Sequence, residues 1–184
     1  MKPTEKLIQE HVIIQSMLSI MLIISESIKA NKVFYTNDVE KIVDFFLNYV
    51  DKHHRSKEEN VFYPGLITVQ STIVHYPINS ILEEHLTGKR YLNEIICCVE
   101  NCKIGNTFSC ERIADCMKNY VHMIVSHIQN EENTFFLFAN SAMSENTEKH
   151  ISEQFNLINK EFKAMGKSEK YDELLNLMTN KYLS

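Results

Sequence analysis

Two short segments of the chain share a pattern of residues that can bind a metal. HRSKEENVFY begins at His54 and HIQNEENTFF begins at His127, and each histidine is followed by a glutamate at the same spacing, Glu58 and Glu131. Residues four apart on a helix point in directions only about 40° apart. Imidazole and carboxylate together suit borderline divalent metals, above all iron where coordination positions stay open. The two segments therefore predict a metal site.

The duplication extends to a further histidine in each half of the chain. Glu10-His11 precedes the first segment and Glu84-His85 precedes the second, at almost the same distance. The chain therefore reads as two helical hairpins of one plan, each with a histidine on its first helix and His-x-x-x-Glu on its second. Hairpins that pack antiparallel about a pseudo-two-fold axis would bring six side chains together: His11, His54, Glu58, His85, His127 and Glu131.

The number of these side chains favours a centre of two metals with open positions. Inward-facing Glu and His from several helices is how helical bundles build two-metal sites. Two six-coordinate ions need about twelve bonds, of which four histidines, two bridging glutamates and an oxo or hydroxo bridge supply about ten. The remaining positions suit water, a small ligand or one more side chain. The candidates for that side chain are His53, His75, His122, Tyr49 and Tyr120.

Neighbouring polar residues have weaker claims on the site. His53 points away from His54 on a helix, so we expect it beside the site or on the surface. Glu10 and Glu84 are expected to contact the predicted ligands at most. Two further residues, Glu59 and Glu132, are expected on the outer side, paired with lysines such as Lys57. The alternative to a metal centre is a hydrogen-bonded polar layer.

Helices must position these residues. The chain has only four Gly and three Pro in 184 residues, and apolar residues recur at steps of three and four from Leu7 onward. We predict a first helix there and further helices over about 38–63, 77–103, 108–139, 145–164 and 168–182, the second ending at Tyr63-Pro64-Gly65. The fold class predicted is all-α, an antiparallel up-down four-helix bundle with two additional C-terminal helices. Residues 1–142 would form the metal-binding bundle, and 143–184 an extension that packs on it.

Composition excludes some classes of partner. Nineteen basic and 24 acidic residues give a net charge of −5 without a basic block, which argues against nucleic acid. The apolar run Val12–Ile24 is shorter than the roughly 20 residues of a membrane span and lacks a cleavage pattern, so we predict a buried helix and no membrane. Five cysteines, an odd number, are read as reduced thiols of a cytoplasmic protein; they are Cys97, Cys98, Cys102, Cys110 and Cys116.

With these residues in place, the sequence resembles the hemerythrin-like family of cation-binding four-helix bundles over about residues 4–140. The matching text is LIQEHVIIQSML, VDFFLNYVDKHHRSKEENVFYPGL, ILEEHLTGKRYL and YVHMIVSHIQNEENTFFLFA. The resemblance implies a non-heme diiron centre with four terminal histidines and bridging Glu58 and Glu131, in which zinc or manganese could replace iron. Oxygen-carrying hemerythrins use five histidines and end in an aspartate ligand. Here both halves end in His-x-x-x-Glu, which disfavours simple oxygen storage.

The expected function is the binding of dioxygen or a related small ligand, such as peroxide or nitric oxide, at the dinuclear site. One alternative is an iron–sulfur cluster repair or nitric-oxide-response protein. Such proteins carry a cysteine pair in an extra N-terminal segment, whereas here the pair Cys97-Cys98 lies mid-helix instead. Another is a sensor or adaptor that exposes its last two helices to a protein partner when metal or oxygen binds. A zinc-filled structural bundle is the fourth reading. Whether the protein turns over a substrate is left open.

Overall fold

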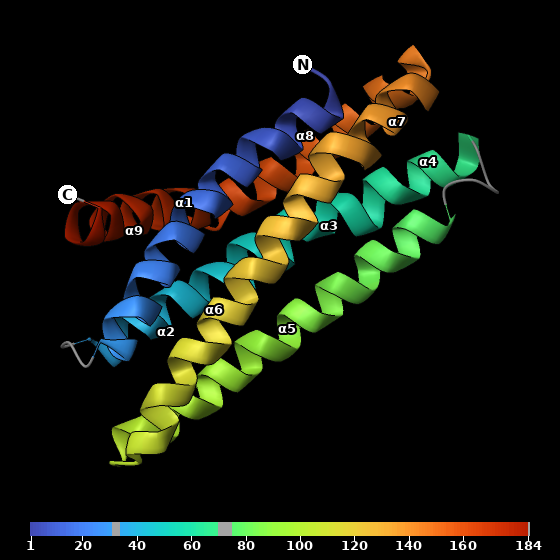
Figure 1. Ribbon diagram of the computed structural model, residues 1–184. Helices are drawn as coiled ribbons and strands as arrows, with labels where there is room; N and C mark the ends of the chain where they lie inside the picture. Colours follow the sequence, from blue (N-terminus) through green and yellow to red (C-terminus); the bar gives the residue numbers. More distant parts are fainter. Residues whose placement is uncertain (31–33, 70–74, 184) are drawn as a thin grey trace.

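The computed structural model describes residues 1–30, 34–69 and 75–183. Every regular element in these ranges is a helix, and none of these residues lies in a strand, so the predicted all-α class is confirmed (Figure 1). Long helical segments lie side by side: α5 packs along α6, α6 also packs along α1, and α2 contacts both α5 and α1.

The first helix, α1, spans Pro3–Lys29. Pro3 suits the first position because its missing N–H would have had no helical partner there. Glu5 accepts a hydrogen bond from the backbone N–H of Lys2 at 2.9 Å and so closes this end. By length and composition α1 is apolar enough to cross a membrane, and half of its most apolar window is buried within the structure.

The second helical segment runs without a break from Thr36 to Val69. Its parts are α2 (Thr36–Phe45), the π-helix η1 (Phe46–His54), α3 (Arg55–Lys57), the π-helix η2 (Glu58–Phe62) and α4 (Tyr63–Val69). The prediction that this helix ends at Tyr63-Pro64-Gly65 is wrong. Proline interrupts a regular α-helix because it lacks an N–H and its ring meets a carbonyl one turn earlier. Here the preceding turn is a π-helix, so the α-type hydrogen-bond ladder is already interrupted where Pro64 enters.

The second half of the chain repeats this plan. Helix α5 (His75–Lys103) turns at Gly105, whose positive φ of 94° suits glycine, into α6 (Thr107–Asn130). The π-helix η3 (Glu131–Phe135) and α7 (Phe136–Ala142) continue α6. Both η2 and η3 begin at a predicted glutamate ligand. π-helical turns are rare and are frequently found at functional sites. Their repetition at the two predicted glutamate ligands therefore indicates a functional site at this position along the helices.

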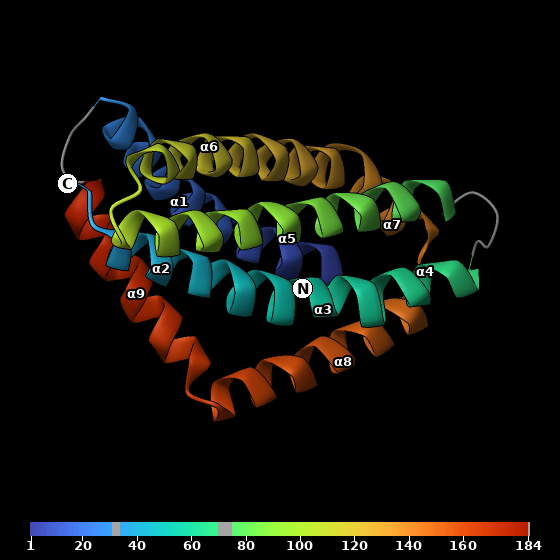
Figure 2. The same ribbon diagram turned by 90° about the horizontal axis from the view of Figure 1, so that it is seen from below.

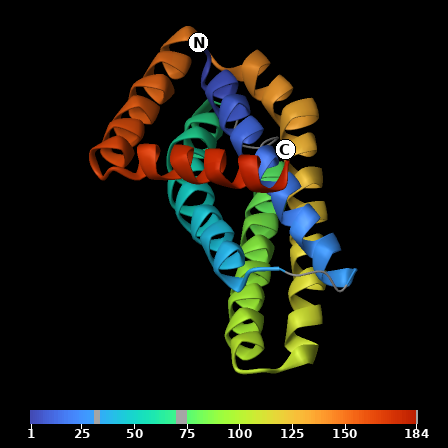
Figure 3. The same cartoon turned by 90° about the vertical axis from the view of Figure 1, so that its left-hand side faces the viewer.

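Two more helices close the chain, α8 (Glu145–Ala164) and α9 (Lys167–Tyr182), at nearly the predicted positions. The Ser144 side chain caps α8 by accepting the Thr147 N–H at 3.2 Å, and Gly166 turns the chain with a left-handed φ of 67°. Figure 2 shows α8 along one side of the other helices, where it contacts η1, η2 and α1. Helix α9 runs back from the end of α8 and, in Figure 3, crosses α1, which it contacts. The predicted division of the chain after residue 142 stays a prediction.

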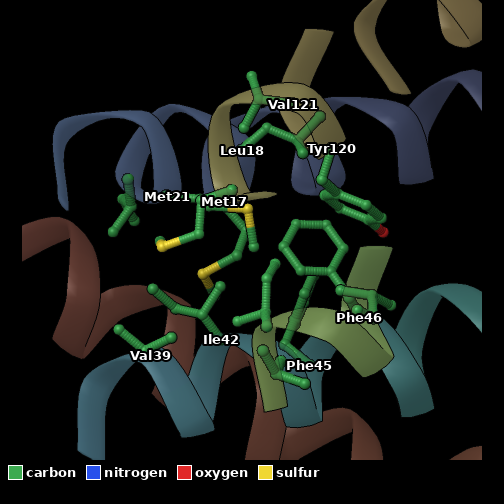
Figure 4. Packing of buried hydrophobic residues seen from close by; sticks show 14 of the residues in the cluster. Met17, Leu18, Met21, Val39, Ile42, Phe45, Phe46, Tyr120 and Val121 are labelled. Carbon is green, nitrogen blue, oxygen red and sulfur yellow. The ribbon is translucent and has the colours of Figure 1, made fainter. Parts of the chain in front are cut away.

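The apolar side chains form two clusters with the predicted metal ligands between them. The larger cluster includes Ile14 on α1, and Figure 4 shows part of it around Met17, Ile42 and Phe46. The smaller cluster includes Leu7, which lies one turn before His11 on the same helix. His11 therefore sits where one cluster ends and the other begins, and hydrocarbon closes the polar layer on both sides.

The cysteines differ from the prediction. Cys102 and Cys110 form a disulfide between the end of α5 and the start of α6, so they are not reduced thiols. The turn at Gly105 brings their Cα atoms to 5.0 Å, a separation that a disulfide can bridge, and sequence spacing alone does not reveal this. Cys97, Cys98 and Cys116 are free. The prediction of a cytoplasmic location loses one of its grounds, because disulfides are typical of oxidising compartments.

Candidate metal centre

The structure brings the six predicted ligands together in two groups of three buried side chains. The groups are His11, His54 and Glu58, and His85, His127 and Glu131. Within each group one nitrogen or oxygen atom per residue lies within 4.8 Å of the others. The histidines come from four different helical segments, as the two-hairpin plan requires. Glu58 follows His54 by about one turn, and Glu131 follows His127 in the same way. These glutamates are the first residues of η2 and η3.

The carboxylate of Glu58 lies between the two groups. Its Oε1 is 3.2 Å from Nε2 of His54, in its own group, and its Oε2 is 3.5 Å from Nε2 of His85, in the other. One carboxylate thus faces histidines of both halves of the chain. This is the position that a bridging carboxylate needs.

Glu131 occupies the matching position, with one difference. Its Oε2 lies 3.3 Å from Nε2 of His11 and 3.4 Å from Nε2 of His127, so it too faces both groups. Its Oε1 accepts a hydrogen bond of 2.9 Å from the hydroxyl of buried Tyr63. Phe136 corresponds to Tyr63 in the second repeat, so Glu58 has no such donor. We did not single out Tyr63 from the sequence, although this Tyr/Phe difference was visible.

Several atoms of this layer are buried without a hydrogen-bond partner among the residues that the structure describes. They are both carboxylate oxygens of Glu58, Oε2 of Glu131 and Nε2 of His11. Leaving a charged group buried and unpaired costs on the order of several kcal/mol. Lone pairs of nitrogen and oxygen that converge on a common centre are what metal cations require. The donor set therefore fits bound cations better than a closed polar layer.

Each histidine is held by a carboxylate from another helical segment. Nδ1 of His54 donates to Glu10 at 2.8 Å, and Nδ1 of His127 donates to Glu84 at 2.7 Å, at equivalent positions of the repeat. The expectation that these glutamates contact the predicted ligands is confirmed. A carboxylate on Nδ1 fixes the tautomer and orients Nε2 toward the centre, as is usual for metal-binding histidines.

The other two histidines are held in the same way, by residues for which our prediction is wrong. Nδ1 of His11 donates to Glu132 at 2.8 Å, and Nδ1 of His85 donates to Glu59 at 2.6 Å. We expected both glutamates on the outer side, paired with lysines such as Lys57. The expectation assumed regular α-helix, whereas a π-helical turn rotates less per residue, so the glutamate after each predicted ligand stays near the site.

The charges of the site shift the pKa values of its members. Burial raises the pKa of Glu10, but the hydrogen bond from His54 and the charge of Lys57 outweigh it and lower this pKa to about 2. Burial lowers the pKa of His54, yet the charges of Glu58 and Glu10 raise it to about 10. For His85, burial lowers the pKa to about 3. Metals bind neutral imidazole, so a cation here would displace the proton that His54 otherwise holds.

Those candidates for a further ligand whose side chains the structure describes lie outside both groups. His53 is buried, accepts a hydrogen bond from Lys57 on Nε2 at 3.0 Å, and stacks on Phe162. Tyr49 and Tyr120 pack in the larger hydrophobic cluster, and His122 is exposed on α6. His75 begins α5, but its side chain lies outside the described residues.

The fold and the site together define a class: an all-helical protein with a buried layer of histidines and carboxylates suited to metal cations. The family model of the hemerythrin HHE cation binding domain matches residues 2–139. The chain therefore belongs to the hemerythrin family of HHE cation-binding domains. Comparisons with curated proteins and with solved structures found no match.

Proposed function

We propose that the protein is a diiron member of this family that binds dioxygen or a related small ligand, such as peroxide or nitric oxide. In this proposal the six clustered side chains would hold two ions, with Glu58 and Glu131 shared between them, in an antiparallel up-down four-helix bundle. The observation that carries it is the carboxylate of Glu58, fully buried, with both oxygens unpartnered in the described part of the chain and facing histidines of both groups.

The residues around the site have separable roles in such a centre. The six side chains would hold iron, which would supply redox chemistry toward the small ligand. The carboxylates on the Nδ1 atoms keep the histidines oriented, and the two apolar clusters exclude water. Tyr63 holds a proton at its hydroxyl oxygen, because burial raises its pKa and the charge of Glu131 raises it further. That proton engages one oxygen of Glu131, so the two bridges are unequal.

The experiment compares absorption spectra under nitrogen and then air. Iron-loaded, reduced protein is expected to develop a charge-transfer band in air, and His127→Ala is expected to abolish it. His122→Ala is the matched control, because His122 lies on the same helix but is exposed. A band that persists in His127→Ala, or one that never forms in iron-loaded wild-type protein, contradicts the proposal.

A second candidate function, a metal-dependent sensor or adaptor, is favoured by one chain of contacts. The ring of Phe162, on α8, stacks on His53 with 3.9 Å between centroids. His53 accepts from Lys57, Lys57 pairs with Glu10, and Glu10 holds His54. The packing of α8 is thus linked to a predicted ligand. Hydrogen exchange tests this: α8 should be protected further when metal binds, and unchanged exchange would contradict it.

We also propose that the ligand is a small diatomic molecule and that the protein has no nucleic-acid or membrane partner. We also propose a cytoplasmic location, against which the Cys102–Cys110 disulfide weighs. Fractionation of cells that express the protein would test the location. Recovery of the chain in a secreted or membrane fraction would contradict it.

A further inference from the structure

The cysteines of the chain lie on α5 and α6, in the half of each helix that is nearer to the turn between them. Cys102 and Cys110 form the disulfide already described. Cys97 is an exposed free thiol, whereas Cys98 and Cys116 are buried free thiols, 6% and 4% exposed. Neither buried thiol belongs to the two groups of the candidate metal centre. Two buried thiols on neighbouring helices therefore have no role in the proposed function.

Two contacts fix which residues of α5 face which residues of α6. Nε2 of His85 lies 3.3 Å from Nε2 of His127. Cys102 comes seventeen residues later on α5, and its disulfide partner Cys110 comes seventeen residues earlier on α6. The two helices therefore run in opposite directions, with one constant register between the level of the histidines and the level of the disulfide.

Cys98 and Cys116 lie between these two levels and contact each other. Cys98 precedes the disulfide by four residues on α5, or about 6 Å, and Cys116 follows it by six residues on α6, or about 9 Å. Their levels along the helices thus differ by only about 3 Å. The two side chains are hydrogen-bonded to each other. Only a small movement is needed to join these two sulfur atoms in a disulfide.

The first half of the chain has no cysteine at the equivalent positions. By the spacing of the repeat from His11 and His54, those positions hold Ile24 and Val43. These two residues are 1% and 3% exposed, and they belong to the same hydrophobic cluster as the two thiols. The fold therefore accepts aliphatic side chains at such places, and packing alone does not call for two cysteines that face each other.

A cleft on the surface of α5 and α6 leads to one member of the pair. Cys116 lines this cleft, whose volume is about 220 Å³, together with Glu94 and Arg112. At about 30 Å³ for each water molecule, the cleft has room for a molecule as small as hydrogen peroxide. Burial raises the pKa of both thiols, that of Cys116 to about 12. Because the thiolate is the reactive form, the pair reacts slowly at neutral pH and stays reduced beside the existing disulfide.

We propose that Cys98 and Cys116 are an oxidant-responsive thiol pair, which hydrogen peroxide converts to a second disulfide between α5 and α6. The thiolate of Cys116 attacks one peroxide oxygen, the O–O bond breaks, and the hydroxide that leaves takes up the thiol proton as water. The sulfur of Cys98 then attacks the resulting sulfenic acid, and its S–O bond breaks to release a second water. Two thiols are thus oxidised and one peroxide is reduced to two waters.

The second disulfide has a structural consequence for the hairpin. It joins the helices that carry His85 and His127, and it lies nearer to these residues than the Cys102–Cys110 bond does. A dithiol reductant reverses the reaction by thiol–disulfide exchange. The inference goes beyond the proposed function, because this chemistry needs neither the metal nor the histidines.

The test treats the folded full chain with hydrogen peroxide at mildly alkaline pH, then blocks the remaining thiols in denaturant and maps the disulfides by digestion and mass spectrometry. Cleavage after Lys and Arg releases residues 113–118, in which Cys116 is the one cysteine. Peroxide is expected to join this peptide to residues 91–103, which contain Cys98, and dithiothreitol to release it again. The experiment is run on protein as purified and on chelator-treated protein, because iron also reacts with peroxide. The same crosslink is expected in both.

Two serine variants identify the partner of Cys116. Cys98→Ser is expected to abolish the crosslink, and Cys97→Ser is the matched control, because Cys97 is the adjacent exposed thiol and its loss should leave the crosslink intact. A Cys116 that stays a free thiol after Cys97 has been oxidised would overturn the proposal. So would oxidation of Cys116 to a sulfinic acid without a crosslink, a crosslink that persists in Cys98→Ser, or one that forms only when metal is present.

Discussion

Glu10 and Glu84 occupy equivalent positions of the repeat. Replacing each by glutamine distinguishes the role they share, holding a histidine, from the role that only Glu10 has, pairing with a lysine. Each glutamate accepts from Nδ1 of a predicted ligand, at 2.8 Å for His54 and 2.7 Å for His127. Glu10 alone also pairs with Lys57, whose side chain is fully buried. Both variants should weaken metal binding, by about 10–100-fold. Only the change at Glu10 should also destabilise the metal-free fold substantially.

The magnitude follows from the burial of Lys57. Removing one partner of a buried ion pair costs about 3–5 kcal/mol, and the lower end applies here because His53 still accepts from the ammonium group. The Glu84 side chain is 33% exposed, so water replaces much of what it loses and the cost should be about 1 kcal/mol. For a chain of this size, about 3 kcal/mol corresponds to a fall of roughly 6–12 °C in melting temperature.

The assay is thermal and urea unfolding of chelator-treated protein, beside metal titration of the same samples. Glu10→Gln should lose clearly more stability than Glu84→Gln, with similar losses of metal affinity. Equal destabilisation by the two variants would refute the assignment of Lys57 to Glu10. Full metal affinity in either variant would refute the role of the carboxylates on the histidines.

Three further predictions concern Glu10, Tyr63 and Cys102. The pKa of Glu10 is lowered from 4.5 to about 2, so its contribution is complete above about pH 5 and is lost as the pH falls toward 2; the stability gap between wild type and Glu10→Gln should close over that range, as measured by urea unfolding. Tyr63→Phe removes the donor to Glu131 and should cost about 1–2 kcal/mol in thermal unfolding of the metal-free protein; an unchanged melting temperature would contradict the hydrogen bond. Cys102→Ser opens the disulfide to Cys110, which closes a separation of 8 residues, and should cost about 2.5 kcal/mol in urea; no difference between the two proteins under oxidising conditions would show that the bond is absent.

The spacing of His54 and Glu58, repeated at His127 and Glu131, was sufficient to select side chains that the structure brings together. The helical periodicity and the duplication can be read from the sequence because each helix must present its predicted metal ligands on its buried face. Helix type was also predictable, since Gly and Pro are rare.

Other features depended on local geometry that periodicity does not encode. Glu59 and Glu132 were misplaced because a π-helical turn changes the direction of the residue that follows each glutamate ligand candidate. Pro64 was read as a helix end for the same reason. The Cys102–Cys110 disulfide depends on how two helices meet at a turn, which is a tertiary property.

The proposal that Glu58 and Glu131 hold two metal ions between the halves of the chain predicts a definite number of ions per chain. Its most direct measurement is titration of chelator-treated protein with ferrous iron under nitrogen, followed by metal analysis of the desalted protein. Two irons per chain are predicted for the wild type, and fewer for Glu58→Ala. A wild type that retains no iron or a single ion, or a Glu58→Ala protein that still retains two, would contradict the claim.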